Sequence, residues 1–437
     1  MLSRPMSASA LAAAVLVITA AARAEPPPAA RVGSHVTPAP DPAPKRMGLR
    51  EAAQLGATLA REVLVARAPR SSAASARRGA DTLFTTLPRA TVMVGGRRGP
   101  AGSGVELGVT VMQDIPLGGV GVARKGAADA LAKTVEADVE RARLESAARA
   151  ATAWIGLAEA DRVLALRQRS LEHAAAVSRT VVARVASGVA DPLEQALSRG
   201  DEATARAAVL EAEGLRFEAA MELAFAAGLP AGTPVEAVGG LSDAPEAPGD
   251  EAALIHRAER DHPLVRLAEA RQAAAHKEID LVAANGIPTI SVGASYMREG
   301  TGDQVWAGMV AVPIPWSRTW AFDAARQRAA ADTASATVAQ VRAELGREIR
   351  VALHEREHTR EVHDALARGA LGPMREALRL SEAMFAAGTL DVTRVLLARQ
   401  RLLTTEETVA RGLADVRRAD VRLLRASGTL LRPEVQP

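Results

Sequence analysis

Cysteine is absent from this 437-residue chain, and aromatic residues make up only 2% of it. Without cysteine the chain can form no disulfide bond. The scarcity of aromatic residues, together with abundant Ala, Leu, Arg and Glu, favours closely packed helices over a bulky globular core. Few of the basic residues are lysines, and basic and acidic residues are interspersed, with a net charge of +3. This pattern is typical of solvated helix faces and argues against a nucleic-acid-binding patch.

Long hydrophobic runs are also missing beyond the N-terminus, where no segment reaches the roughly 18 apolar residues of a transmembrane helix. Arg4 precedes an apolar run over residues 10–21, which is too short to span a bilayer, and Ala-Arg-Ala at residues 22–24 fits a cleavage site. We therefore predict a secretory signal peptide over residues 1–24, with a short N-terminal anchor as the alternative. The lack of cysteine also excludes a lipid-modified cysteine at the mature N-terminus.

The main feature of the remaining chain is a duplication. Gly188 recurs as Gly388 and Asp191 recurs as Asp391, both 200 positions later. Further matches join Arg199 to Arg399, 227–228 to 427–428, 91–95 to 289–293 and 115–116 to 314–315. A unit of this length is too long for a solenoid repeat. We therefore expect one fold built from two halves.

Each half contains a tight turn between two long helices. The turn residues are Gly188, Asp191, Pro192 and Glu194 in the first half, and Gly388, Asp391 and Arg394 in the second. Each glycine can adopt the left-handed conformation that ends a helix, and each aspartate can cap the next one. In the first turn the proline fits the first helical position and the glutamate completes a capping box. The second turn lacks both.

The signals divide the mature chain into five segments. They are a disordered Pro/Ala-rich segment (25–47), a first repeat (48–228), a Pro/Gly/acidic linker (229–250), a second repeat (251–428) and a loose tail (429–437). The predicted helices are 49–66, 71–87, 123–186, 192–227, 251–260, 264–284, 322–384 and 391–426, with a kink expected at Gly372-Pro373. A helix of over 60 residues would be about 95 Å long. Leucines at 157, 164 and 171 suggest coiled-coil-like packing.

Each repeat also contains a predicted β-hairpin, over 90–116 and 289–315. The predicted strands are 90–94, 105–111, 289–297 and 305–315, with a glycine-rich loop over 95–104 and a Gly/Asp turn over 300–303. Four strands could pack on the chain's own helices or enter a membrane. In lipid the sheet would have to close with copies from other subunits, because every backbone group must be paired. Tyr296, Trp306, Trp316 and Trp320 would then lie at the lipid interface, although they could simply pack at strand ends.

These features resemble the outer-membrane factor (TolC-like) family of efflux channels, from about residue 49 to residue 428. The resemblance rests on the duplication, the two Gly-x-x-Asp turns, and the prolines Pro116 and Pro315 between strand and helix. The run from Asp261-His262-Pro263 to Pro315 is most similar to the heavy-metal-efflux (CzcC-like) branch.

The resemblance implies a fold that is mainly α with a small β part. Three copies would form a 12-stranded outer-membrane β-barrel that continues as a periplasmic α-helical barrel. It implies a homotrimer in the cell outer membrane, a passive exit duct served by an inner-membrane pump and a periplasmic adaptor, with no catalytic activity and no cofactor. The tips near 188–192 and 388–392 would form the gate and dock the adaptor. The cargo, divalent metal ions or drugs and other small molecules, is left open.

The tip charges depart from the family pattern. Family members carry acidic residues shortly after the second tip, where this chain has Arg394 and Leu397, and the first half has Glu194 and Leu197. The acidic ring therefore does not carry over. We expect Arg184, Glu194 and Arg394 to set the electrostatics of the tips, with solvated helix charges as the alternative.

Two alternatives belong to other classes. His354-Glu355-x-x-His358 matches the zinc-metalloprotease motif, but the first repeat has an ordinary helical segment at 154–158, so we predict a chance match and no metal site. A periplasmic coiled-coil adaptor would have one helical hairpin between split β-domains, and the two hairpins predicted here argue against it.

Overall fold

The computed structural model describes residues 43–82, 86–100, 102–241, 250–314 and 319–432, all within one unit, Ala43–Pro437. Its helices are α1 (Leu49–Leu59), α2 (Arg61–Arg67), α3 (Arg70–Ala80), α4 (Val120–Ala186), α5 (Pro192–Ala226), α6 (Glu251–Asp261), α7 (Pro263–Asn285), α8 (Thr319–Asp364), α9 (Leu371–Ala386) and α10 (Val392–Ala426). Its strands are β1 (Lys45–Met47), β2 (Arg89–Gly99), β3 (Gly102–Ile115), β4 (Val235–Ala237), β5 (Ile290–Arg298) and β6 (Gln304–Ala311). The expected mainly helical class is confirmed. The predicted signal peptide lies outside the described residues.

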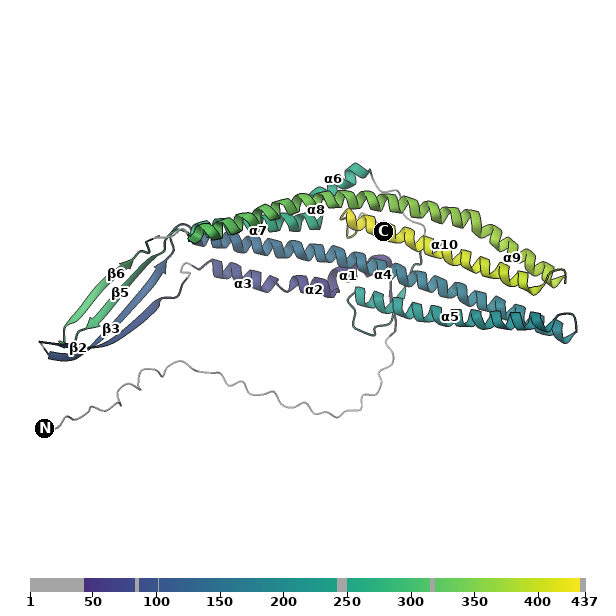
Figure 1. Ribbon diagram of the computed structural model, residues 1–437, viewed down its shortest axis with the longest axis horizontal. Coiled ribbons are helices and arrows are strands. Elements are labelled where there is room, and N and C mark those ends of the chain that lie inside the picture. The colour runs from purple at the N-terminus through teal and green to yellow at the C-terminus, as the bar shows by residue number, and fades with distance from the viewer. Residues whose placement is uncertain (1–42, 83–85, 101, 242–249, 315–318, 433–437) are drawn as a thin grey trace, which may run out of the picture. The chain divides into compact units, whose positions relative to one another are not determined.

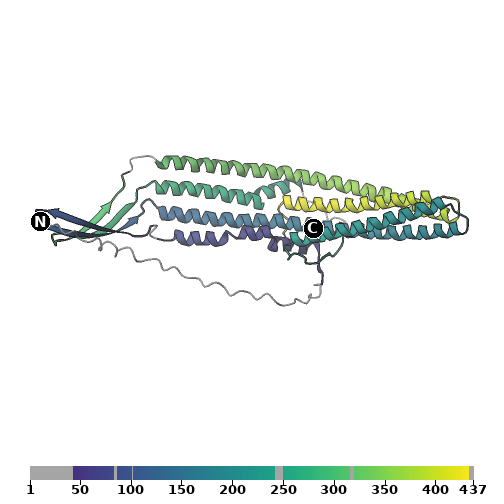
Figure 2. The same cartoon turned by 60° about the horizontal axis from the view of Figure 1, so that its bottom comes forward.

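The helices run side by side along two long members, α4 and α8 with its continuation α9 (Figures 1 and 2). Helices α7 and α10 both pack between α4 and α8, α7 along one part of their length and α10 along another. Helices α1, α2, α3 and α5 pack against α4. No proline interrupts α4, whose 67 residues extend about 100 Å at 1.5 Å per residue. No described helix is both long enough and apolar enough to cross a membrane.

The larger sheet is antiparallel, with the strand order β2-β3-β5-β6. The register pairs Val92 with Val109, Val109 with Tyr296, and Tyr296 with Trp306. The glycine-rich loop predicted over 95–104 is wrong, because β2 and β3 continue through it and stay paired to Gly99↔Gly102. Cross-strand hydrogen bonds there outweigh the weak strand propensity of glycine.

Two segments predicted to lack structure contain a strand each. Residues 45–47, from the segment expected to be disordered, form β1 and pair in parallel with β4, which lies in the predicted linker. Similarly, Thr429 and Leu430 of the predicted loose tail are buried, at 3% and 5% exposure. Tertiary packing orders these short segments in each case, which composition could not indicate.

The helix predicted over 49–66 is broken at Ala60, whose ψ is 143°. The turn after α5 occupies the break: Gly228 has φ +72°, and a Cβ on it would lie 2.3 Å from the carbonyl oxygen of Leu59. Only glycine allows this approach between two backbones. The second half has a matching arrangement, in which Gly428 (φ +69°) packs on His262 between α6 and α7.

The kink expected at Gly372-Pro373 is a π-helical turn over Ala365–Ala370, one turn earlier in the chain. Proline removes a backbone donor, and its ring crowds the carbonyl four residues before it, here that of Gly369. A π-turn absorbs that disruption without ending the helix. The matching part of the first hairpin is uninterrupted α4.

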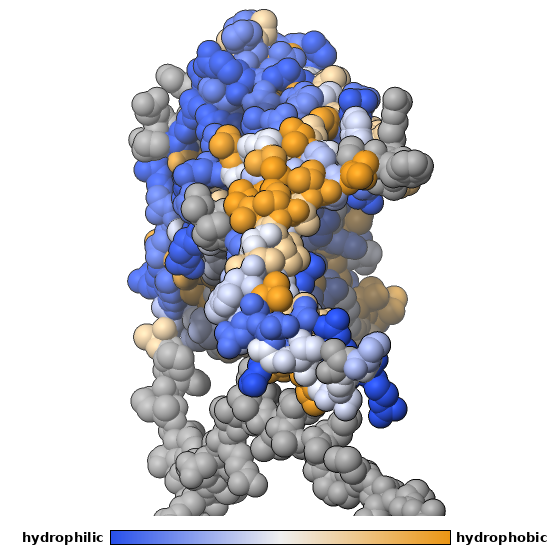
Figure 3. Space-filling view, turned by 90° about the vertical axis from the view of Figure 1, so that its left-hand side faces the viewer, coloured by the Kyte–Doolittle hydropathy of each residue, from blue (hydrophilic) through white to orange (hydrophobic). Residues whose placement is uncertain are grey.

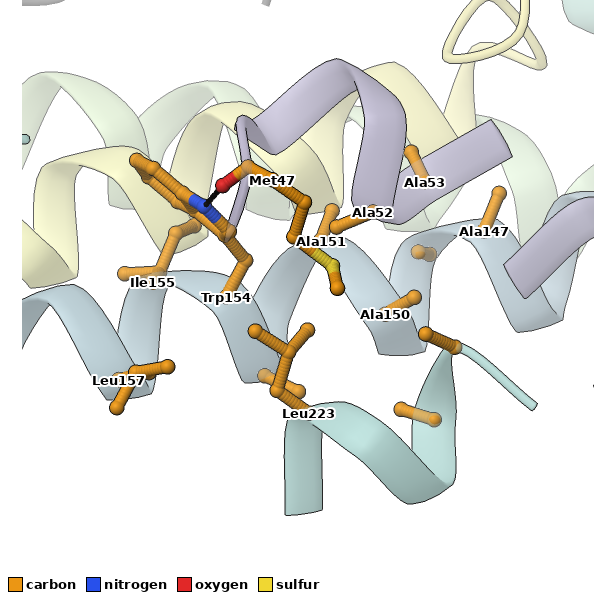
Figure 4. Close-up of a cluster of buried hydrophobic side chains, with 14 of the residues drawn as sticks. Met47, Ala52, Ala53, Ala147, Ala150, Ala151, Trp154, Ile155, Leu157 and Leu223 are labelled. Carbon is orange, nitrogen blue, oxygen red and sulfur yellow. Dashed lines mark hydrogen bonds between the residues drawn. The ribbon is translucent and has the colours of Figure 1, made fainter. Parts of the chain in front are cut away.

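The largest hydrophobic cluster lies where α1, α4, α5 and β1 meet (Figure 4). Met47 packs beside the indole of Trp154, whose Nε1 donates a 2.8 Å hydrogen bond to the carbonyl oxygen of Met47. Most other members are alanines, including Ala147, Ala150 and Ala151. Small side chains bring the helices close together, so this core is thin and depends on shape more than on bulk.

Arginines of α10 bind acidic residues of its neighbours. Arg418 pairs with Glu159 on α4, Arg422 pairs with Glu355 on α8, and Arg425 pairs with both Glu145 on α4 and Glu348 on α8. In the reverse direction, Arg356 of α8 binds Asp420 of α10 at 2.5 Å, with both side chains 10% exposed or less. These pairs fix α10 between α4 and α8.

His262 joins the start of α7 to the end of α10. Its Nδ1 accepts a hydrogen bond from the Leu264 amide (3.1 Å), so its Nε2 carries the proton and donates to the carbonyl oxygen of Arg425 (3.0 Å). The side chain is 2% exposed, and this burial lowers the pKa of His262 below its usual value. The folded chain therefore holds a neutral histidine.

We expect this histidine to make the fold sensitive to acid. Below a pH of about 6.5, His262 takes up a proton in the unfolded chain but stays neutral in the folded chain. The free energy of unfolding therefore falls by up to about 1.4 kcal/mol per pH unit. His262→Asn keeps a cap acceptor but cannot titrate, so its melting temperature should fall less between pH 7.5 and pH 5.5. Far-UV circular dichroism measures this. His256→Asn, at an exposed site on α6, is the matched control. Equal acid sensitivity in the wild type and His262→Asn would contradict the assignment.

Candidate functional site

The two helical tips are built as their sequences predict. Gly188 and Gly388 have φ of +76° and +74°. The amide after each glycine bonds back to the last turn of the preceding helix, Val189 to the Arg184 carbonyl (2.9 Å) and Thr389 to the Met384 carbonyl (3.0 Å). These bonds satisfy carbonyls that a helix end would otherwise leave unpaired.

Aspartates begin the returning helices. Asp191 accepts a hydrogen bond from the Leu193 amide (2.8 Å), and Asp391 accepts one from the Arg394 amide (3.2 Å). Only the aspartate half of the expected capping box forms. Among the described residues, no hydrogen bond joins the Glu194 side chain to the amide of Asp191, and one Glu194 carboxylate oxygen is buried without a partner.

Arg184 links the two tips within one chain. Its guanidinium donates a 2.9 Å hydrogen bond to the carbonyl oxygen of Phe385 and lies 4.7 Å from the centre of the Phe385 ring. Beneath it, Val181 packs with Leu378, Phe385, Val392 and Val395. Sequence reasoning singled out Arg184 as a tip charge but missed Phe385. The signal was available, because the first repeat has valine where the second has this phenylalanine.

The arginine of the second tip is solvated. Arg394 is exposed, and its side chain makes no hydrogen bond or ion pair with the described residues. Leu193 and Val189 are also exposed, at 63% and 67%. The tips therefore present apolar side chains, one arginine and one partly buried carboxylate, while Arg184 is held by the second hairpin.

The sheet has two chemically different faces. One face carries exposed apolar side chains on all four strands, and the view from the sheet's side shows hydrophobic residues gathered there (Figure 3). By register this face comprises Ala90, Val92 and Val94 of β2, Val105, Leu107, Val109 and Val111 of β3, Val292, Ala294 and Tyr296 of β5, and Trp306 and Val310 of β6. Exposure reaches 71% at Val105 and 76% at Trp306. The opposite face carries mainly Gly, Ser, Thr and Met.

The predicted interface aromatics fall at both ends of the sheet. Tyr296 and Trp306 pair across β5 and β6 near their connecting turn, with ring centres 4.6 Å apart. Trp320 lies in the first turn of α8 and packs against Gly286 at the end of α7. Trp316 lies outside the described residues.

The His354-Glu355-x-x-His358 motif lies on an exposed face of α8. The two imidazoles are stacked with centres 6.2 Å apart, while Glu355 is bound by Arg422. Within the described ranges, no three His, Cys, Asp or Glu side chains are grouped closely enough to hold a metal ion. The structure thus gives Glu355 a role in joining α8 to α10.

Comparisons with known proteins agree with this architecture. Residues 254–429 match the family described as outer membrane efflux protein. No curated protein sequence matches the chain.

Several solved structures share the fold. The outer-membrane channel OprN is 21% identical with a TM-score of 0.71, and the match covers 87% of this chain and 90% of OprN. The CmeC channel of Campylobacter jejuni is 16% identical with a TM-score of 0.71, covering 89% of this chain and 87% of CmeC. The open state of the MtrE channel of Neisseria gonorrhoeae is 18% identical with a TM-score of 0.69, covering 89% of this chain and 91% of MtrE. Residues 254–429 thus match the outer membrane efflux protein family, and the chain has the fold of these outer-membrane channels.

Proposed function

We propose that the chain is one subunit of a passive outer-membrane channel through which an efflux system releases its substrate. The observation that carries this proposal is the β2-β3-β5-β6 sheet, whose apolar face is exposed on every strand. Water solvates such a face poorly, whereas lipid chains match it. The opposite face, which carries mainly Gly, Ser, Thr and Met with several charged residues, suits an aqueous pore.

The sheet is incomplete by itself. Among the described residues, the outer edges of β2 and β6 have no partner strand. In lipid an unpaired edge costs several kcal/mol for each backbone group, so the sheet must close on other copies of itself. Single-chain barrels have at least eight strands, and three copies of this sheet would supply twelve.

The helices support the same assembly. In the half toward the tips the helix layer ends in α5 on one side and α8 on the other, whereas α1, α2 and α3 lie along α4 nearer the sheet (Figure 1). Both α5 and α8 expose large apolar side chains. Leu210 and Phe217 of α5 are each 64% exposed, and Val351 and Val362 of α8 are 49% and 44% exposed. Contact between α8 of one copy and α5 of the next would cover these residues and close a helical barrel under the sheet.

The aromatic residues fit a membrane-spanning sheet. Tyr296 and Trp306 would lie at the outer interface, near the β5–β6 turn, and Trp320 at the periplasmic interface, where α8 begins. Tryptophan and tyrosine favour this position because their rings are apolar and their N–H or O–H groups can reach water.

The tips are the proposed gate and docking site. Gly188, Asp191, Pro192 and Glu194 form the first tip, and Gly388, Asp391 and Arg394 form the second. A periplasmic adaptor would bind there, and an inner-membrane pump would supply the energy. Divalent metal ions remain a proposed cargo that rests on resemblance to the heavy-metal-efflux branch.

The assembly can be tested by the native mass of the protein extracted with mild detergent from outer membranes. We expect a particle of three chains, the number that the resemblance to the outer-membrane factor family implies, because a closed ring of these sheets would pair every strand edge. A soluble periplasmic monomer would overturn the proposal and return attention to the adaptor alternative.

A matched pair of variants controls for the orientation of the sheet. Ala294 and Ser295 are neighbours on β5 and point to opposite faces. Ala294→Arg places a charge in lipid at a cost of about 2–4 kcal/mol, so we expect less protein in the outer membrane. Ser295→Arg faces the pore and should assemble normally.

The link between Arg184 and Phe385 predicts an effect on gating. Arg184→Met removes a charge-assisted hydrogen bond and a cation–π contact together worth about 2 kcal/mol, or roughly a 30-fold change in the population of separated tips. We expect higher conductance of the purified channel in planar bilayers. Arg179→Met removes an exposed charge from the same helix and should leave conductance unchanged. Equal conductance in both variants would show that this link does not restrain the tips.

A further inference from the structure

Four methionines lie on one face of the sheet. They are Met93 on β2, Met112 on β3, Met297 on β5 and Met309 on β6, which is one methionine from each strand. By register all four lie opposite the apolar face, on the face that also carries Val305. The apolar face contains none. If only apolar bulk were required, valine or leucine would serve, as they do on the other side.

The register arranges the four side chains in two pairs, each across a glycine. Met93 and Met297 both lie opposite Gly108, and Met112 and Met309 both lie opposite Gly293. Strands two apart are about 9.6 Å from each other, a span that two methionine side chains can bridge over a residue without a side chain.

The side chains lean into these gaps. A Cβ on Gly108 would lie 3.5 Å from the terminal methyl carbon of Met93, and a Cβ on Gly293 would lie 2.8 Å from Cγ of Met112. The side chain of Met93 thus extends over Gly108 toward the strand that carries Met297. Met93 is 51% exposed, so it does not serve as filling for a packed core.

Thioethers are soft, polarizable donors, and because the chain has no cysteine they are its only sulfur ligands. Soft ligands select soft cations. We propose that the two pairs, Met93 with Met297 and Met112 with Met309, bind soft monovalent metal cations, Ag⁺ or Cu⁺.

Carboxylates on the same face favour cations near both pairs. Glu106 lies two residues before Gly108 on β3, and Asp114 lies two residues after Met112. Glu106 shares Arg97 with Glu299, so one negative charge remains in that cluster. Asp114 accepts a 2.5 Å hydrogen bond from Ser291, while the exposed Arg89 lies opposite Met112 and brings a positive charge to the same face. The Met93–Met297 pair should therefore bind more tightly.

That these pairs line a pore rests on the proposed function, whereas the pairs themselves lie within a single chain. In the closed barrel, three copies would place twelve thioethers on the inner wall. A series of weak, exchangeable sites would let soft cations move along the wall without being trapped, because conduction requires sites that release as well as bind.

Silver binding to the purified full chain tests the proposal. The probe is silver nitrate in chloride-free buffer, and bound silver is measured by elemental analysis after gel filtration and by isothermal titration. We expect the wild type to bind silver at both pairs. Met93→Leu with Met297→Leu should lose the tighter site, and Met112→Leu with Met309→Leu should lose the weaker one. The quadruple leucine variant should lose both.

Leucine nearly preserves the volume of methionine, so these variants should fold. If the quadruple variant does not, the two double variants still decide the question. Met221→Leu with Met374→Leu, both outside the sheet, is the matched control and should bind silver as the wild type does. Wild-type protein that binds no silver, or undiminished binding in both double variants, would overturn the proposal. Silver binding by a chain that proves monomeric would uphold these sites while refuting the channel.

Discussion

The ion pairs between α10 and its neighbours are the interaction on which the helical part depends. The neighbouring helix α4 is rich in alanine and offers little apolar area, so packing alone specifies the register of α10 against it weakly. Arg399 of α10 is buried and binds both Ser170 of α4 and Asp201 of α5, and Arg418 and Arg425 bind glutamates farther along α4. Exposed pairs of this kind add little to stability, but a buried charge that loses its partner costs about 3–5 kcal/mol. If α10 were shifted along its neighbours, several charged side chains would lose their partners at once. These pairs therefore select one alignment of the helices.

The duplication explains why the two halves have similar structures. The positions at which the two copies differ show where the halves have different roles. Gly228 and Gly428 both pack into a break between two helices, the first beside Ala60 and the second beside His262. The tips likewise share a left-handed glycine and a capping aspartate. The second hairpin alone contains a π-helical turn, and Arg184 of the first hairpin binds Phe385 of the second. The hairpins are thus built on one plan but are mechanically unequal, one being continuous and the other interrupted.

Local chemistry made much of this fold predictable. Glycine and aspartate located both tips, proline located the start of α5 and α7, and alternation located the strands and their apolar face. What could not be predicted depends on contacts between distant segments. No proline marks the break between α1 and α2 at Ala60. The break exists because the turn at Gly228 approaches the backbone there. The pairing of β1 with β4 depends on a partner strand far along the chain, and β2 extends through its glycines because β3 pairs with it. Local propensity gives no information on such partners. The bond between Arg184 and Phe385 required the two tips to be placed side by side.

The methionines of the sheet follow neither from the duplication nor from the fold. At the offsets that relate the two halves, Met93 corresponds to Ser291 and Met112 to Ala311, both of which lie on the same face but carry no sulfur. The methionines of the second half, Met297 and Met309, occupy other positions. The two halves therefore share this face of the sheet as a result of the duplication, but they do not share its methionines. Each methionine pair nevertheless lies opposite one glycine. The two methionine pairs thus occur at positions that the repeat does not relate. A requirement for thioethers on this face of the sheet explains them better than a need for apolar bulk, which the opposite face meets with valine and leucine.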